Sequence, residues 1–236
     1  MDYRIRLIRQ KEIARETRLF AFEKPKGFSF RAGQCADINL LNPKFLDNAG
    51  VRRTFSIASA PYEKNLAFAV RMRGSAFKRS LEQLTSGEEV LLEGPMGSFG
   101  LHKNLEKPAI LIAGGIGITP FISILRDSHR KGEEREIVLL YSNRSAIDVA
   151  FYEELEEMAG RYKSFGFVPT LTRPGKKWRG ETGRIGKKLL TKYLGKMGNS
   201  IFYVAGTLSF VVGIREKLLG LGVSEDDIRT DEFPGY

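Results

Sequence analysis

The sequence predicts a two-domain protein of 236 residues. A six-stranded antiparallel β-barrel is expected over residues 1–104, and an α/β domain over residues 105–236, with a parallel sheet and helices on both of its faces. The first half holds six short strand-like segments separated by turn residues, which is typical of a small barrel. The second half alternates strand-like with helix-like segments, which is typical of a parallel sheet. At its start, a glycine-rich turn joins a buried strand to a helix.

The barrel strands are expected at residues 4–9, 17–22, 34–40, 53–58, 66–72 and 88–93. Residues 23–27, with a proline and a glycine, form the turn between the first two strands. A short helix is expected between the fifth and sixth strands, because Phe77, Leu81 and Leu84 fall on one helical face. Six short strands at this spacing predict a small closed barrel.

The α/β domain is predicted to begin between Phe99 and Pro108. Its strands are expected at residues 109–113, 136–142, 165–170 and 201–204. Its helices are expected from residue 118 on, at residues 148–159 and 184–194, and around the apolar face Val211, Ile214, Leu218 and Leu221.

The turn after the first of these strands is the first candidate site. Gly114, Gly115 and Gly117 precede a helix whose apolar residues recur at positions 118, 121, 122 and 125. The amides and the positive dipole end of such a helix suit a phosphate. Two alternatives stay open: a crossover without a ligand, and a membrane span, because residues 108–125 carry no charge.

Composition excludes several kinds of site. Hydrophobic residues make up 42% and charged residues 28% of the chain, which is ordinary for a globular protein with a core. Cys35 is the only cysteine, so a disulfide within the chain or a cysteine-ligated cluster is excluded. His102 and His129 lack the spacing of metal ligands, and no bound metal is expected. The charged start, residues 1–9, does not fit a signal peptide, so we expect a cytoplasmic protein.

The net charge of +10 is uneven along the chain. Residues 1–104 carry 18 Lys and Arg against 11 Asp and Glu, and residues 105–236 carry 20 against 17. A first half of +7 suits an acidic protein, a phosphate-rich ligand, a nucleic acid or an anionic membrane surface, whereas a merely soluble basic surface is the alternative. Because no basic run interleaved with aromatic residues is present, no nucleic-acid partner is expected.

Two further stretches could bind a ligand. In the first, Arg53 and Phe55 share one face of a strand and Ser56 lies on the other. These groups suit a phosphate, a flat ring and the edge of that ring, although an ordinary strand with an exposed arginine is the alternative. In the second, Gly74 and Ser75 precede the short helix. Its first-turn amides would form a second anion site, or Ser75 would be a simple N-cap.

With these motifs in this order, the chain resembles the ferredoxin–NADP reductase superfamily over essentially its whole length. It looks most like the stand-alone bacterial and archaeal oxidoreductases with an FAD barrel followed by an NAD(P) domain. The Arg-x-Tyr/Phe-Ser flavin motif of the family matches residues 53–56, and its Gly-to-Ser stretch before a helix matches residues 74–80. Its Gly-Gly-x-Gly-x-Thr-Pro motif matches residues 114–120, and the ending 231–236 resembles the family's short tail beside the flavin.

The resemblance implies hydride transfer from nicotinamide to flavin and assigns roles to residues. Arg53 would hold the FAD pyrophosphate, Phe55 the ribityl chain or ring face, and Ser56 the region around the flavin N5 atom. The other implied flavin contacts are Thr54, Met72, Gly74, Ser75, Ala76, Ser80 and Phe233, with Glu232 as a flavin contact or proton relay. The implied coenzyme contacts are Gly114, Gly115, Gly117, Thr119, Pro120, Ser142, Asn143, Arg144, Ala205 and Gly206. Many relatives have Cys-Gly-Pro at residues 205–207, so Thr207 fills the role of the missing thiol or that role is dispensable.

The sequence indicates the coenzyme and the electron acceptor less directly than the flavin. The second strand of the α/β domain ends in Ser142, Asn143 and Arg144 without an acid to bind a ribose 2′-hydroxyl, which favours NADPH over NADH. The resemblance and the basic first half imply an acidic electron-transfer partner, a ferredoxin or a flavodoxin. The alternatives are a reductase of free flavin, ferric chelates or quinones, a non-catalytic flavin-binding subunit of a larger complex, and a basic nucleic-acid-binding barrel.

Overall fold

A computed structural model describes residues 2–195 and 197–233 of the chain. Their contacts form two compact units. The first contains the residues up to Gly100 together with Thr119–Asp127, and the second contains Leu101–Ile118 together with the residues from Ser128 on. The assignment of residues 1–104 to a flavin and of residues 105–236 to a nicotinamide coenzyme stays a prediction.

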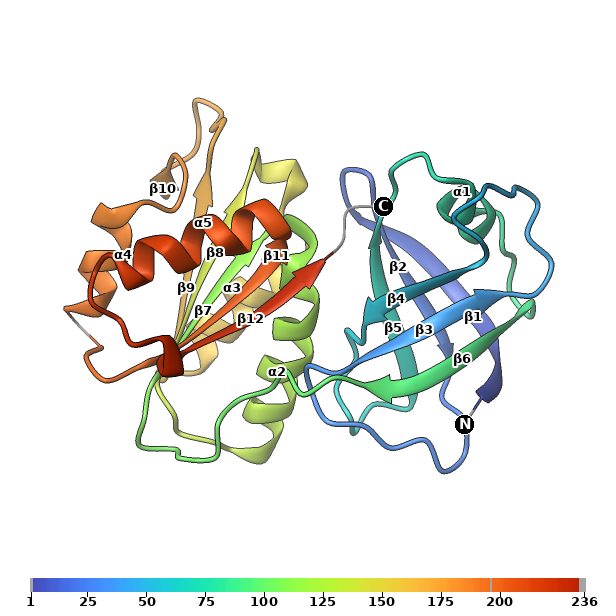
Figure 1. Ribbon diagram of the computed structural model, residues 1–236, viewed down its shortest axis with the longest axis horizontal. Coiled ribbons are helices and arrows are strands. Elements are labelled where there is room, and N and C mark those ends of the chain that lie inside the picture. Colours follow the sequence, from blue (N-terminus) through green and yellow to red (C-terminus); the bar gives the residue numbers. More distant parts are fainter. Residues whose placement is uncertain (1, 196, 234–236) are drawn as a thin grey trace. The chain divides into compact units, whose positions relative to one another are not determined.

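The first unit contains a six-stranded antiparallel sheet in the order β4-β3-β6-β1-β2-β5, drawn in blue and teal, with β6 in green, in Figure 1. A bridge between Ile57 and Phe68 joins its two outer strands, so the sheet closes into a barrel. The strands are β1 (Asp2–Ala14), β2 (Thr17–Glu23), β3 (Cys35–Leu40), β4 (Arg52–Ser56), β5 (Asn65–Arg71) and β6 (Glu89–Met96).

The barrel core consists of apolar side chains from these strands and from one helix. Alternate residues of a strand point to the same face, and the inward residues include Ile5 and Leu7 of β1 and Phe20 and Phe22 of β2. Helix α1 (Ala76–Glu82) adds Phe77 and Leu81 to this core. The predicted short helix is therefore confirmed, and its burial explains the spacing of its apolar residues.

The second unit contains a parallel sheet in the order β10-β9-β8-β7-β11-β12. The order reverses between β7 and β11, so these two strands flank the topological switch point of the sheet. The strands are β7 (Ala109–Gly114), β8 (Ile137–Asn143), β9 (Phe165–Leu171), β10 (Glu181–Thr182), β11 (Ile201–Thr207) and β12 (Ile228–Phe233). The helices are α2 (Ile118–Lys131), α3 (Tyr152–Arg161), α4 (Lys187–Leu194) and α5 (Leu208–Leu219).

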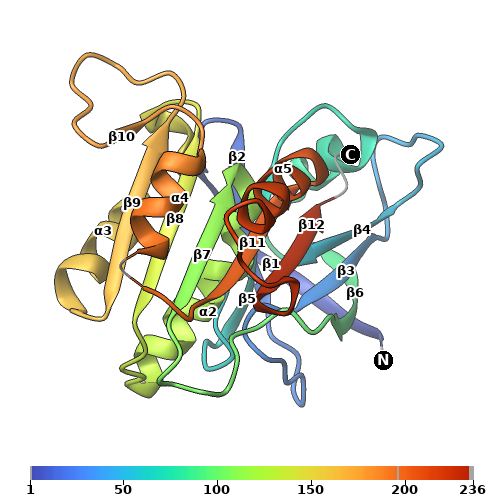
Figure 2. The ribbon, with the colours of Figure 1, turned by 60° about the vertical axis from the view of Figure 1, so that its left-hand side comes forward.

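Helices cover both faces of this sheet. Leu190 of α4 and Val211, Ile214 and Leu218 of α5 pack with Ile110, Ile112, Val138, Leu140, Phe202 and Val204 of the strands. Helix α3 lies on the opposite face of β9, as the two views of Figures 1 and 2 agree. The predicted fold class is confirmed for both units.

The structure corrects four details of the sequence prediction. Helix α3 begins at Tyr152 instead of residue 148, because Ser145 and Asp148 form a capping box around a short 3-10 turn and Phe151 adopts a left-handed conformation with φ of 61°. Helix α4 begins at Lys187 instead of residue 184. Strands β10 and β12 were not predicted; residues 231–233 therefore belong to a sheet strand, and residues 234–236 of the predicted tail lie outside the described residues.

The uncharged stretch 108–125 consists of strand β7, the glycine turn and the first half of α2. Over residues 2–195 and 197–233, we find no helix with both the length and the apolar character that crossing a membrane requires.

Candidate active site

The guanidinium of Arg53 is fixed in a buried position on β4. Arg53 is 4% exposed, and its Cζ lies 5.2 Å from the ring centroid of Phe77 in α1. The ring of Phe55 lies 5.9 Å from the same ring, so Arg53 and Phe55 share a face as predicted. The Nη1 atom donates to the backbone carbonyls of Ala49 (2.8 Å), Gly50 (3.2 Å) and Arg52 (2.6 Å).

The start of α1 brings further charged groups to Arg53. Asp47 accepts a hydrogen bond from the Ala76 amide at 3.1 Å, and its other oxygen lies 4.0 Å from Arg53 Nη2. A carboxylate is thus held by a guanidinium and a helix-start amide, which are groups that bind phosphate. Lys78 is 8% exposed. Burial lowers its pKa most, and the guanidinium groups of Arg73 and Arg53 lower it further.

This charge arrangement fits the diphosphate of FAD. Clustered cations raise each other's free energy, and an anion among them relieves that repulsion. Ser56, at the other end of β4, is 7% exposed, and its hydroxyl has no hydrogen-bond partner among the described residues. A hydroxyl that is accessible and not used within the protein can serve a flavin ring edge. Thr54 lies on the outer face, where its hydroxyl donates to Asp37.

Three predicted flavin residues have structural contacts of their own. The Ser80 hydroxyl donates to the Phe45 carbonyl (3.0 Å) and accepts from the Phe45 amide (2.8 Å), so it holds the segment after β3 against α1. Met72 packs against the barrel core. Ser75 is the N-cap of α1 and accepts from the Lys78 amide at 3.4 Å, as its alternative interpretation predicted. Their contacts with a flavin stay predictions, as does that of the exposed Gly74.

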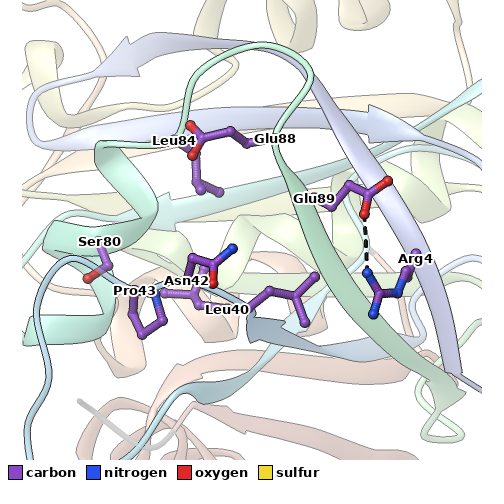
Figure 3. Close-up of a pocket in the computed structure, with 9 residues that line it drawn as sticks. Arg4, Leu40, Asn42, Pro43, Ser80, Leu84, Glu88 and Glu89 are labelled. Atoms are coloured by element: carbon purple, nitrogen blue, oxygen red, sulfur yellow. Dashed lines mark hydrogen bonds and ion pairs between the residues drawn. The ribbon is translucent and has the colours of Figure 1, made fainter.

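A cavity of about 420 Å³ also opens beside Ser80 (Figure 3). The remaining lining residues are Arg4, Leu40, Leu41, Asn42, Pro43, Leu84, Glu88 and Glu89. Its rim includes an exposed ion pair between Arg4 and Glu89 at 3.5 Å. Ser80 is the only predicted flavin residue in this lining, so the cavity is separate from the Arg53 and Ser56 groups.

The glycine turn at the end of β7 lies very close to the backbone of β11. A Cβ on Gly117 would lie 2.1 Å from the Ala205 carbonyl oxygen, so only glycine lets the turn pass β11. Gly115 has φ of 54°, in the left-handed region that glycine adopts readily. Helix α2 follows directly, with Thr119 and Pro120 as its second and third residues. Proline is tolerated there because first-turn amides have no partner within the helix.

The start of α2 suits a phosphate electrostatically. In the described structure, the start of α2 has neither a side-chain cap nor an acidic residue in its first turn. The positive end of the helix dipole is therefore not compensated by a carboxylate of the helix itself. A pyrophosphate placed over residues 114–117 would meet this end.

The carboxyl ends of β8 and β9 carry two exposed arginines, Arg144 and Arg173. The Arg173 amide donates to the Arg144 carbonyl at 2.7 Å, so the two residues are neighbours. Asn143, between Ser142 and Arg144, is 6% exposed, and its buried Nδ2 has no hydrogen-bond partner among the described residues. These groups could bind the adenosine end of a dinucleotide.

The ends of β11 and β12 bring the last predicted residues together. Ala205 pairs with Asp231, Gly206 with Glu232 and Thr207 with Phe233 in parallel register. The Thr207 hydroxyl lies 3.4 Å from that of Ser209. Thr207 and Glu232 are exposed, so both side chains are accessible at this sheet edge.

Sequence reasoning missed Asp47, Lys78 and Arg173. Lys78 lies between the predicted contacts Ala76 and Ser80, which is the one signal that could have pointed to it, whereas Arg173 lies 29 residues after the nearest predicted contact, Arg144. Asp47 gives no such signal, since it reaches the start of α1 from the connection between β3 and β4.

Comparisons with known proteins find relatives that match nearly the whole chain. The family model described as oxidoreductase NAD-binding domain matches residues 111–216. Ferredoxin–NADP reductase B of Sorangium cellulosum is 30% identical and is matched over 98% of this chain and 97% of its own length. The phenol hydroxylase P5 protein of Acinetobacter pittii is 27% identical over 98% of this chain, which spans only 65% of that relative.

Solved structures share the fold at lower sequence identity. A ferredoxin NADP+ reductase from Neisseria gonorrhoeae, solved with FAD and NADP, has a TM-score of 0.82 at 21% identity and covers 98% of each chain. The FAD/NAD-binding domain of the Vibrio cholerae nitric oxide dioxygenase has a TM-score of 0.86 at 21% identity and covers 99% of each chain. The chain therefore belongs to the ferredoxin–NADP reductase family of FAD- and NAD(P)H-dependent oxidoreductases.

Proposed function

We propose that this protein takes a hydride from NADPH onto FAD and delivers the electrons to a separate acidic carrier, a ferredoxin or a flavodoxin. One observation carries the proposal. The chain combines a buried cationic site at β4 and α1 with a glycine turn at the switch point of a parallel sheet. The first suits a flavin diphosphate, and the second suits the pyrophosphate of a dinucleotide.

When bound, FAD supplies the electron chemistry, because it accepts a hydride and releases electrons onward. The protein's part is orientation and exclusion of water. Arg53 and Lys78 would hold the diphosphate, Phe55 the flat part of the ligand, and the Ser56 hydroxyl the ring edge. Glu232, exposed at the end of β12, would contact the flavin or exchange a proton with it.

The coenzyme would cross the carboxyl edge of the parallel sheet. Its pyrophosphate would lie over residues 114–117, and its 2′-phosphate beside Arg144 and Arg173. Its nicotinamide would lie at Ala205, Gly206 and Thr207. The absence of an acid at residues 142–144 supports NADPH over NADH, because a ribose 2′-hydroxyl is commonly bound by a carboxylate.

Colour and anaerobic reduction test this proposal. We expect the purified protein to be yellow, to bleach when NADPH is added without oxygen, and to reduce cytochrome c when ferredoxin is supplied. A colourless protein that takes up no added FAD would contradict the flavin assignment. Bleaching without electron transfer to ferredoxin or flavodoxin would contradict the acceptor while leaving the hydride step in place.

A further inference from the structure

The aromatic ring of Phe210 fills the space above two glycines at the end of the parallel sheet. Phe210 lies in the first turn of α5. A Cβ built on Gly114 would lie 2.9 Å from ring atoms Cγ and Cδ1, and one built on Gly206 would lie 2.9 Å from Cδ1. The ring therefore occupies the volume that side chains at both positions would need.

Gly114 is the last residue of β7 and Gly206 the last but one of β11, the two strands that flank the switch point. Ligands of open α/β sheets bind in the crevice outside the carboxyl ends of the strands at this point. Phe210 is only half-buried, so part of its ring packs on the glycine backbone and part stays accessible. The ring thus presents a surface at the carboxyl ends of these strands, where a ligand of such a sheet is expected.

The order of the strands shows which half of a dinucleotide this surface meets. Arg144 and Arg173 end β8 and β9, on one side of β7. Phe210 lies over β7 and β11, on the other side. Neighbouring strands are about 4.8 Å apart, so an extended dinucleotide with its adenosine end at the arginines reaches β11 with its nicotinamide half.

We propose that Phe210 is a positioning residue that supports the nicotinamide half of the coenzyme, an inference that rests on the proposed function. The flat, apolar ring limits how deeply this half can enter the crevice, and it presents a face on which a ribose or an aromatic ring can pack. Gly114 and Gly206 lack side chains because the ring takes that place.

Calorimetric binding of NADP+ and of 2′,5′-ADP tests the proposal, because 2′,5′-ADP lacks the pyrophosphate-linked nicotinamide half. In Phe210→Ala we expect NADP+ to bind about tenfold more weakly, with the affinity for 2′,5′-ADP unchanged. An unchanged NADP+ affinity, or an equal loss for both ligands, would overturn it. Phe210→Leu, which keeps an apolar side chain without the ring, gives the same test if the alanine variant does not fold.

Val211→Ala is the matched control. Val211 is the next residue of α5 and is fully buried in the core on the sheet. This variant should lose thermal stability and keep both affinities, since Val211 lies outside the crevice. A change in the ratio of the two affinities in Val211→Ala would show that a general loosening of α5 produces the effect, and would overturn the assignment to Phe210.

A second, independent measurement concerns the packing of the ring. Gly114 has φ of −112°, which alanine adopts without strain, so Gly114→Ala should destabilise the protein only through the ring. In the Phe210→Ala background the same change should be tolerated. Additive losses of thermal stability would show that the ring does not occupy this space. If the wild type binds neither NADP+ nor 2′,5′-ADP, the proposed function itself fails.

Discussion

Arg144 and Arg173 are exposed guanidinium groups on adjacent strand ends, where their charges are available to a ligand. Replacing Arg144 with Gln removes a charge-assisted hydrogen bond to a 2′-phosphate, which NADH lacks. We expect the KM for NADPH to rise about tenfold, on the order of 1.4 kcal/mol, and the KM for NADH to stay the same. Steady-state kinetics with both coenzymes measure the two KM values. An equal rise in KM for NADPH and NADH would show that Arg144 does not bind the 2′-phosphate.

His129 gives the stability of the protein a defined dependence on pH. Its ring stacks on Tyr162 with centroids 3.8 Å apart, and burial lowers its pKa from 6.5 to about 4. Between pH 6.5 and 4 the unfolded chain therefore binds a proton that the folded chain does not. The contribution of neutral His129 is complete above about pH 6.5 and is lost as the pH falls towards 4.

Urea unfolding at several pH values checks this expectation. The midpoint of the wild type should fall between pH 6.5 and 4 more steeply than that of His129→Phe, which keeps the aromatic stack. His102, whose pKa is also lowered by burial, is present in both proteins and cancels in the comparison. Parallel curves would show that His129 does not contribute.

Lys78 shows why single residues of the site escaped sequence reasoning. The pattern that predicts α1 uses its apolar residues, and a lysine between them is normally at the surface. Here it is 8% exposed, because it follows Phe77 into the space beside Arg53. Arg53, Phe55 and Ser56 could be predicted because their types alternate along one strand, whereas Lys78 depends on how α1 packs on the barrel.

At the scale of elements, the glycine turn between β7 and α2 needs glycine for two different reasons. Gly117 has no room for a side chain, and Gly115 has a backbone conformation that favours glycine. Gly117→Ala places a Cβ 2.1 Å from a backbone oxygen of β11, so the strand or the turn must move. We expect a loss of roughly 3 kcal/mol or more in the free energy of unfolding. Gly115→Ala meets no atom within 4 Å but keeps φ at 54°, and should cost about 1 kcal/mol.

Urea unfolding of the two variants measures both losses in the free energy of unfolding. The dependence of this free energy on urea concentration should be the same in both variants and the wild type. Equal losses would mean that the turn is limited by its backbone angles and that the approach of Gly117 to β11 is relieved by a small movement.

Most elements could be predicted from apolar periodicity, and the exceptions have physical causes. Strand β12 has the sequence Ile-Arg-Thr-Asp-Glu-Phe at the edge of the sheet, where few of its side chains are buried. An edge strand buries too little to show alternation. The two-residue strand β10 exists only through its pairing with β9. Partner strands supply the hydrogen bonds of both elements, and the local sequence does not reveal them.

At the scale of the molecule, net charge predicts how an acceptor docks. The chain carries +10, and surface charges attract an acidic carrier over a Debye length of about 10 Å at 0.1 M salt and 3 Å at 1 M. Ferredoxin-dependent reduction of cytochrome c should therefore slow as salt rises. Reduction of a neutral quinone by the same protein is the control and should not change. A ferredoxin rate that is constant with salt would contradict electrostatic docking.

Averaging charge over halves of the sequence conceals where the charge lies. Residues 105–236 sum to only +3, yet residues 173–188 alone hold seven Lys and Arg and a single acid, Glu181. All seven basic residues are exposed. Trp178 holds this segment in place, since its indole nitrogen donates to the Glu181 carbonyl at 2.9 Å. The location of this charge depends on a loop conformation, which composition cannot supply.

The seam of the barrel is the part of this unit whose stability would depend most on a bound flavin. Strand β4, which carries Arg53 and Ser56, is joined to β5 by the isolated bridge between Ile57 and Phe68, whereas β2 and β5 pair over seven successive residues. A flavin held along β4 would favour the closed seam by mass action. Molecules made during riboflavin shortage would open there more often and reach proteases sooner. The amount of the protein in the cell would then fall when the concentration of flavin falls.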